Sequence, residues 1–166
     1  MYHIAVISTL VIGSVKWGKW ARWKEYLPTI YYFCSCNLLY HYFSDMDKHL
    51  WMFKKHISKQ FITELLYLIL AYPCLILLFL GNYPLRSRSR WVHYFKYISI
   101  SIILEFIGTK LGAITYMNGW TFGWTAFFYL TMYPMIRLHY KNPILALILS
   151  VFFTTFYLIV FNYELK

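Results

Sequence analysis

Long apolar runs separated by short polar connections make up most of the chain, and their lengths predict helices. Six such runs can be drawn. A helix needs about 20 residues to cross the hydrocarbon of a membrane, so the last four runs are long enough, the second is nearly so, and the first would be tilted, partial or interfacial. The pattern predicts an all-α integral membrane protein, a compact bundle of five or six transmembrane helices with short loops. The runs are Tyr2–Val15, Tyr26–Phe43, Phe61–Leu80, Val92–Tyr116, Thr121–Leu138 and Ile144–Phe161.

The connections between the runs are short. None is long enough for a separate soluble domain, so residues 1–166 are expected to form a single domain. Pro28 falls in the first turn of its run, where proline is tolerated, whereas Pro73 lies near the middle of the next run and predicts a kink. Asn118 and Gly119 form a strong turn signal between the fourth and fifth runs.

The composition also favours a membrane environment. Hydrophobic residues make up 60% of the chain and charged residues 13%, whereas a typical soluble domain is about 45–50% apolar and about 25% charged. The net charge is +10, and a basic balance can indicate nucleic-acid binding. The cations nevertheless cluster between the apolar runs, as is typical of cytoplasmic loops. The predicted partners are therefore membrane lipids and not nucleic acids.

The distribution of lysine and arginine predicts an orientation. If all six runs span, ten cations fall on one side of the membrane and six on the other. The side with more cations is expected in the cytoplasm, which places both termini outside. The first group is Lys16, Lys19, Arg22, Lys24, Arg86, Arg88, Arg90, Lys96, Arg137 and Lys141, and the second is Lys48, Lys54, Lys55, Lys59, Lys110 and Lys166.

The segment KWGKWARWK at residues 16–24 interleaves tryptophans with cations. One interpretation is a cuff that binds anionic lipids. The other is ordinary anchoring at head-group depth, which tryptophan, lysine and arginine all favour. The same two interpretations apply to SRSRW at residues 87–91.

The fourth run carries two ionisable residues, Glu105 and Lys110. On a helix with 3.6 residues per turn they lie about 140° apart, so they are not expected to pair. Lys110 lies near the end of the run, where its stem can reach the head groups, whereas Glu105 lies near the middle and should face protein, a polar cavity or a ligand. Gly108 and Gly112 form a small-x-x-x-small pattern that lets another backbone come close. The residues on the Glu105 side of this helix are Gly108, Thr109, Gly112 and Tyr116.

A candidate ligand site follows from this stripe, because a carboxylate at bilayer depth is a functional residue by default. Asn37 in the second run is a polar residue that could face the stripe. The turn YMNGWTFGW at residues 116–124 has two interpretations, a tight turn with an aromatic belt or a rim over the Glu105 stripe. The candidate ligand-binding residues are Glu105, Thr109, Tyr116, Asn37, Asn118 and Trp120.

The sequence gives no support for standard soluble catalysis. Cys34 and Cys36 would lie about 160° apart on a helix, so they cannot jointly hold a metal, and with Cys74 they are expected to be apolar, buried thiols. The six histidines show no metal-binding spacing. The nucleophile-elbow, P-loop and dinucleotide fingerprints are absent as well. No metal site is predicted, and the sequence names no cofactor.

Several short strings follow one another between Trp23 and Pro143. They are YLPTIYYF, NLLYHYF, LWMF, TELLY, AYP, NYPL, MNGW with Trp124, and RLHYKNP. In this order they resemble an uncharacterised family of small multi-pass membrane proteins from endospore-forming Gram-positive bacteria. The resemblance implies a bacterial plasma membrane and carries no activity with it.

Three functions fit these observations. The first is a ligand-binding or permeation protein in which Glu105 anchors an ion, a proton or a small ligand, working as a homo-oligomer because one small bundle leaves little room for a pathway. The second is a membrane enzyme acting on a lipid or isoprenoid, with Glu105 as general acid or base and a second polar group facing it. The third is a sporulation-linked sensor or assembly protein in which Glu105 only holds helices together.

Overall fold

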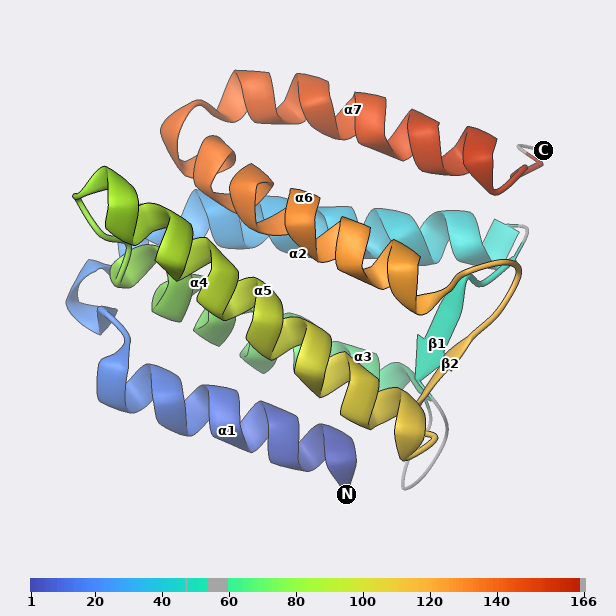
Figure 1. Cartoon of the computed structure of the whole chain (residues 1–166), viewed down its shortest axis with the longest axis horizontal. Helices are drawn as coiled ribbons and strands as arrows, with labels where there is room; N and C mark the ends of the chain where they lie inside the picture. Colours follow the sequence, from blue (N-terminus) through green and yellow to red (C-terminus); the bar gives the residue numbers. More distant parts are fainter. Residues whose placement is uncertain (47, 54–59, 165–166) are drawn as a thin grey trace.

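The computed structural model describes residues 1–46, 48–53 and 60–164, and within these ranges the chain is all-α apart from two three-residue strands. Helical passes run back and forth along a common direction, so that both termini lie at the same end of the bundle (Figure 1). The passes are α1 (Tyr2–Trp17), α2 (Trp23–Met46), α3 (Gln60–Leu66) continuing through the π-helical segment η2 (Tyr67–Ala71) into α4 (Tyr72–Gly81), α5 (Ser87–Lys110), α6 (Phe122–Lys141) and α7 (Pro143–Val160).

The third pass changes its helical type just before Pro73. Proline has no N–H to donate, and its ring would clash with the carbonyl four residues earlier. That carbonyl belongs to Ile69, which lies in the wider turns of η2. The chain stays helical through Pro73, and η2 is the local adjustment directly before the proline.

Two predicted helix starts and one predicted end are corrected. α2 begins at Trp23, so Pro28 lies inside the helix and not in its first turn. α5 begins at Ser87, because the polar SRSRW segment is already helical. The same helix ends at Lys110 and does not continue to Tyr116.

Gly112 explains why α5 ends where it does. Its φ is +65°, a left-handed conformation that glycine adopts without steric cost. The Ala113 N–H donates to the Gly108 carbonyl at 2.8 Å, and the Gly112 N–H donates to the Thr109 carbonyl at 3.0 Å. These two bonds form a Schellman motif, which terminates a helix. Gly112 is therefore a helix stop and not part of a helix-packing pattern.

A small sheet closes one end of the bundle. Strand β1 (Trp51–Phe53) pairs antiparallel with β2 (Ile114–Tyr116), and Trp51 lies opposite Tyr116. The next residues form the predicted turn: Asn118 and Gly119 have φ of 49° and 85°, and the Trp120 N–H donates to the Met117 carbonyl at 2.9 Å. Positive φ at both central positions is typical of a type I′ turn. We call this end, with both termini, the capped end.

The best-packed part of the core lies between α2, α4 and α6. Phe79 of α4 and Tyr133 of α6 are inaccessible to solvent, and their ring centroids are 5.0 Å apart. Burial of one such aromatic side chain stabilises the fold by about 1.5–3 kcal/mol. The other buried members of this cluster are Tyr26, Ile30, Ile76, Leu77, Leu80, Met132 and Ile136.

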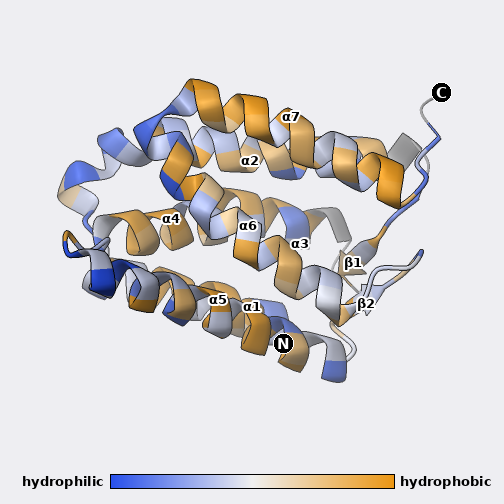
Figure 2. Ribbon diagram, turned by 45° about the horizontal axis from the view of Figure 1, so that its top comes forward, coloured by the Kyte–Doolittle hydropathy of each residue, from blue (hydrophilic) through white to orange (hydrophobic). Residues whose placement is uncertain are grey.

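The opposite end of the bundle, formed by the turns at residues 17–23, 81–87 and 141–143, is strongly cationic. Figure 2 shows hydrophilic residues gathered there, whereas apolar residues run along α7. We call it the basic end. Nine of the ten cations predicted for one side of a membrane lie in or close to these turns, whereas Lys96 lies nine residues into α5; among the described residues Glu25 is the one acidic side chain at this end. Of the six cations predicted for the other side, Lys54, Lys55, Lys59 and Lys166 lie outside the described residues.

Two helical segments are long and apolar enough to cross a membrane, Ile62–Gly81 and Pro143–Val160. The expectation of five or six spans goes beyond this finding. α1 has only 16 residues, and α5 opens with the charged stretch from Ser87 to Arg90.

Candidate functional site

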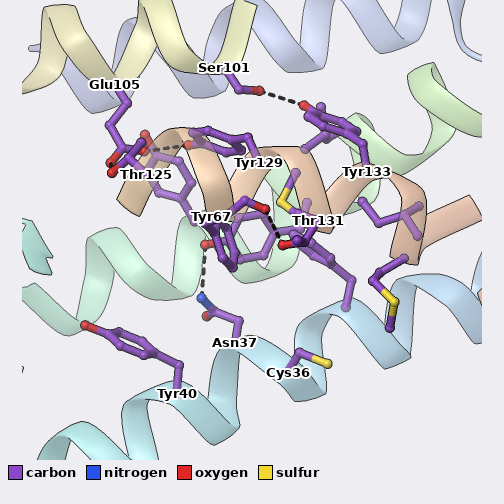
Figure 3. Close-up of a pocket in the computed structure, with 18 of the residues that line it drawn as sticks. Cys36, Asn37, Tyr40, Tyr67, Ser101, Glu105, Thr125, Tyr129, Thr131 and Tyr133 are labelled. Atoms are coloured by element: carbon purple, nitrogen blue, oxygen red, sulfur yellow. Dashed lines mark hydrogen bonds between the residues drawn. The ribbon is translucent and has the colours of Figure 1, made fainter. Parts of the chain in front are cut away.

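Glu105 lies at the centre of a hydrogen-bond network that joins α5 to α6 and β2. Tyr129 donates its hydroxyl proton to Oε2 at 2.6 Å, and Tyr116 donates to Oε1 at 2.8 Å. Thr125 lies 2.8 Å from the same Oε1. Figure 3 shows Glu105 and Tyr129 pointing toward one another across the pocket. Three hydroxyl groups from two other elements therefore converge on one carboxylate.

Further groups hold these donors in place. The buried Thr125 hydroxyl accepts from the Trp120 indole N–H at 2.9 Å and also lies 3.0 Å from the Tyr116 hydroxyl. Burial and the nearby Glu105 both raise the pKa of Tyr116, so its hydroxyl stays protonated and able to donate. The turn at the capped end is thereby tied to the carboxylate through Trp120 and Tyr116.

The first residues of α1 complete the surroundings of the carboxylate. The Tyr2 hydroxyl donates to the Leu104 carbonyl at 2.6 Å, next to Glu105 in the chain. A Cβ on Gly108 would lie 2.8 Å from Ile114 Cδ1 and 2.9 Å from the end of the Tyr2 side chain, so a larger residue here would displace these two side chains. Part of the predicted glycine pattern thus serves close packing, here against a side chain of α1.

Glu105, Thr125, Tyr129, Trp120 and Tyr2 line a partly open cavity of about 1630 Å³ that runs between the helices. Its walls are rich in tyrosine, and Tyr2, Tyr67, Tyr72 and Tyr129 all line it. Tyr67 is the first residue of η2, and Tyr72 directly follows its last residue. The site therefore combines one carboxylate with a wall of phenol groups.

The depth of Glu105 differs from the prediction. Because α5 stops at Lys110, Glu105 lies five residues from the end of its helix, about 7.5 Å at 1.5 Å per residue. It was expected near the middle of a longer helix. The carboxylate sits under the capped end, covered by β2 and the turn that follows. Lys110 points elsewhere, with its ammonium group 5.4 Å from the centroid of the Phe106 ring.

Two of the other predicted site residues join the network, and three do not. Tyr116 contacts Glu105 directly, and Trp120 reaches it through Thr125. Thr109 donates to the Phe106 carbonyl of its own helix. Asn37 lies across the pocket on α2, where it donates to the Tyr72 hydroxyl at 3.2 Å (Figure 3). Asn118 is exposed and donates to the His49 carbonyl at 2.7 Å, so it stabilises the loop at the capped end.

The sequence prediction missed Thr125 and Tyr129, and a signal for them exists. Polar residues recur every four positions on both α5 and α6, and this spacing puts each set on one helix face. The two faces meet, as shown by the bond that Tyr129 donates to Glu105 and by the 2.6 Å contact between the Ser101 and Tyr133 hydroxyls. The α5 set is His93, Tyr97, Ser101 and Glu105, and the α6 set is Thr125, Tyr129, Tyr133 and Arg137.

The three hydroxyls leave part of the Glu105 carboxylate open to a further donor. A carboxylate accepts hydrogen bonds at about four sites, and three hydroxyls occupy three of them. No ion pair joins Glu105 to a lysine or arginine within the described ranges. A cation in the cavity would therefore meet one free acceptor site and several aromatic rings.

Comparison of the chain with family models, curated proteins and solved structures finds no match.

Proposed function

We propose that this chain is a multi-pass protein of a bacterial plasma membrane that binds a small organic ammonium ion at Glu105. The observation that carries the proposal is the Glu105 carboxylate itself, which lines a large cavity, accepts from three hydroxyls and has no lysine or arginine partner among the described residues. The binding-or-permeation function expected from the sequence is thus the one the geometry supports best.

The aromatic wall favours an ammonium ion as the ligand. Tyrosine faces attract cations, most strongly where water is excluded. The cavity is also far larger than an alkali ion requires. An ammonium group could take the remaining acceptor site on Glu105 while its alkyl part lies against the rings of Tyr67 and Tyr72.

Burial supports the membrane placement. Only 6% of the most apolar window of α7 is buried inside the protein, and 28% of the window in Ile62–Gly81. A core helix of a soluble protein is mostly buried, so these exposed apolar faces are better explained by lipid. The cationic residues at the basic end fit the cytoplasmic side of such a membrane, and the resemblance noted above agrees with a bacterial plasma membrane.

The test is binding of tetramethylammonium and ethylammonium chloride to the purified full-length protein in lipid nanodiscs, read as a shift in the unfolding temperature. Sodium chloride at equal ionic strength is the salt control. We expect saturable stabilisation of the wild type and at least tenfold weaker ammonium binding by Glu105→Gln, which is about 1.4 kcal/mol. Glu25→Gln, which removes a carboxylate at the other end, should bind like the wild type.

Two results would contradict the proposal. One is absence of any ammonium-dependent stabilisation in the wild type. The other is a Glu105→Gln protein that is less stable yet binds ammonium unchanged, which would assign Glu105 a purely structural role. Uptake of labelled methylammonium into proteoliposomes then separates permeation from binding alone.

A further inference from the structure

Arg137 at the basic end is held by aromatic ring faces and not by a carboxylate. Its guanidinium carbon lies 4.1 Å from the centroid of the Tyr83 ring and 5.3 Å from that of Tyr140. Such stacking stabilises a cation but leaves the N–H donors at its edge available. In the part of the chain that the structure describes, no carboxylate forms an ion pair with this half-buried guanidinium.

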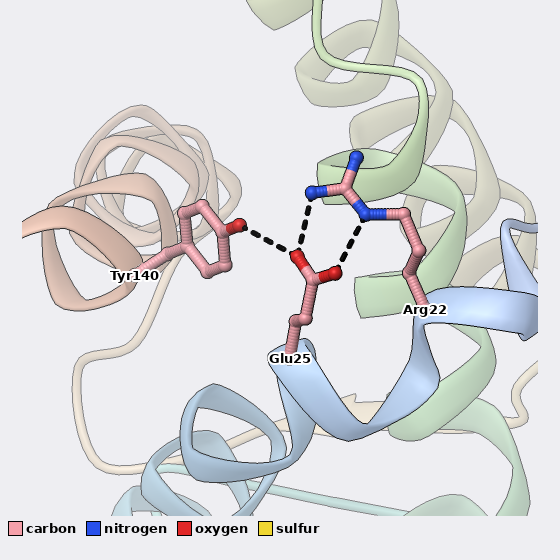
Figure 4. A network of polar contacts seen from close by, with 3 residues as sticks. All are labelled: Arg22, Glu25 and Tyr140. Carbon is pink, nitrogen blue, oxygen red and sulfur yellow. Dashed lines mark hydrogen bonds and ion pairs between the residues drawn. The ribbon is translucent and has the colours of Figure 1, made fainter.

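The nearby carboxylate already has a partner. Arg22 binds Glu25 through two bonds, Nε to Oε1 at 2.8 Å and Nη2 to Oε2 at 2.6 Å (Figure 4). Tyr140 approaches the same carboxylate, with its hydroxyl 3.4 Å from Oε2, while its ring face lies toward Arg137. Glu25 is thus neutralised by Arg22, and Tyr140 separates it from Arg137.

A pair of tyrosine hydroxyls lies beside Arg137, and a second guanidinium, that of Arg90, lies one helical turn from one of them on α5. The Tyr83 hydroxyl donates to the Tyr94 hydroxyl at 3.3 Å, which leaves the Tyr94 proton for another acceptor. Arg90 is anchored by a 2.7 Å bond from Nη2 to the Leu85 carbonyl, and its side chain is otherwise exposed. Arg90 and Tyr94 are four residues apart on α5, so their side chains share one face of that helix. Cationic and hydroxyl donors therefore gather at one place.

We propose that Arg137 and Arg90, with the Tyr94 hydroxyl, bind a phosphate group, which in a membrane is the phosphodiester of an anionic phospholipid. Guanidinium groups bind phosphate oxygens through paired N–H bonds, and a half-buried cation without a counter-charge gains most from such a partner. The proposal rests on the membrane placement proposed above and not on Glu105.

The surroundings favour a lipid as the source of the phosphate. Leu85, Trp91 and Phe95 are 90%, 76% and 74% exposed around the start of α5, so exposed apolar side chains lie close to Arg90 in the chain. Exposed tryptophan beside arginine is typical of head-group depth. The excess of cations at the basic end selects an anionic head group over a zwitterionic one. This site refines the lipid-binding interpretation of SRSRW to one arginine on α6 and one on α5.

The test is a titration of the detergent-purified full-length protein with short-chain phosphatidylglycerol, with phosphatidylcholine and inorganic phosphate as separate ligands. We expect Arg137→Gln to weaken phosphatidylglycerol binding about tenfold, as for loss of a charge-assisted pair. Arg88→Gln removes an equal charge from the exposed first turn of α5 and should weaken it less than about twofold, since surface charges contribute little. Arg137→Lys, which keeps the charge without the planar fork, should fall between the two.

Each outcome supports or contradicts the proposed lipid-phosphate site. Equal losses in Arg137→Gln and Arg88→Gln would overturn the site, because they would show diffuse attraction only. Equal affinity for phosphatidylcholine would also overturn it. Binding of inorganic phosphate that depends on Arg137 and is as tight as lipid binding would keep the phosphate site and assign it to a soluble phosphate ester. Glu105→Gln should leave the lipid titration unchanged, which separates this site from the ammonium site, and unfolding temperatures without lipid identify any variant that fails to fold.

Discussion

The two ends of the bundle each surround one ionisable side chain with tyrosines, and they do so in opposite ways. At the capped end, Tyr116 and Tyr129 point their hydroxyl protons at the Glu105 carboxylate. At the basic end, Tyr83 and Tyr140 present their ring faces to the Arg137 guanidinium. A tyrosine has a negative face and a positive hydroxyl proton, so one residue type can stabilise either sign. The chain, with 17 tyrosines, can thus hold both charges apart in an apolar bundle.

The difference also predicts how each end responds to mutation. A hydroxyl bond is directional, and its loss leaves a half-buried acceptor without a partner. The attraction between a cation and a ring face depends less on direction. A guanidinium that loses one of its two aromatic rings keeps the other ring and its contact with water. Changes at the capped end should therefore cost more stability than changes at the basic end.

The largest effect is expected for Tyr129→Phe. The substitution removes the 2.6 Å bond to Glu105 with little change in shape, and hydrogen bonds to charged groups contribute about 1.5–3 kcal/mol. We expect the free energy of unfolding in detergent to fall by about 2 kcal/mol. Tyr31→Phe, at an exposed position of α2, is the matched control and should leave it within about 0.5 kcal/mol. Equal effects of the two variants would show that the Glu105 network does not stabilise the fold.

A smaller effect is expected when the stacked arginine loses one ring. Tyr83→Leu removes the nearer ring face, and a cation–π contact contributes about 0.5–2 kcal/mol. A double-mutant cycle with Arg137→Gln should give a coupling energy of about 1 kcal/mol. A coupling near zero would mean that Tyr83 supports Arg137 only by packing. A coupling as large as the Tyr129→Phe effect would remove the contrast between the two ends.

The smallest effect concerns the exposed Arg22–Glu25 pair. The hydrogen bonds from Arg22 lower the pKa of Glu25 below its usual value. The pair therefore contributes above the unfolded pKa of about 4.3, and the contribution is lost as the pH falls through the lower folded pKa. We expect a carboxyl NMR titration to place the Glu25 midpoint below the usual glutamate value. In Arg22→Gln the midpoint should rise back to that usual value. A midpoint that does not move in Arg22→Gln would show that the ion pair does not form in solution.

Much of the helical layout could be read from the chain, because apolar periodicity and length are local properties. The errors also have local causes. Gly112 was interpreted as a packing residue inside a helix, although a glycine just after Lys110 is equally a helix stop. The apolar pattern alone starts the helix at Val92, yet arginine is a good helix former and α5 begins at Ser87.

Tyr116 lies beside Glu105 for a different reason from the one that the sequence pattern suggests. A continuous helix would put the two residues on one face, whereas α5 ends at Lys110 and strand β2 returns the Tyr116 side chain to Glu105. Its hydroxyl reaches Glu105 because β2 pairs with β1 across the end of the bundle. Thr109 and Asn118, chosen by the same local reasoning, bond to backbone carbonyls elsewhere.

By itself, the sequence determined an all-α chain, the approximate extent of its helices, the turn at Asn118–Gly119 and the separation of Glu105 from Lys110. Each of these depends on residues close together in the chain, where propensity and spacing act directly. The tertiary structure decided that Tyr129 and Thr125 face Glu105, that the carboxylate lies under the capped end, and that Arg137 rests between Tyr83 and Tyr140. Those facts depend on which helix faces pack together, and the chain contains several tyrosine-bearing faces of similar hydrophobicity. Only the packing of α6 against α5 selects among them.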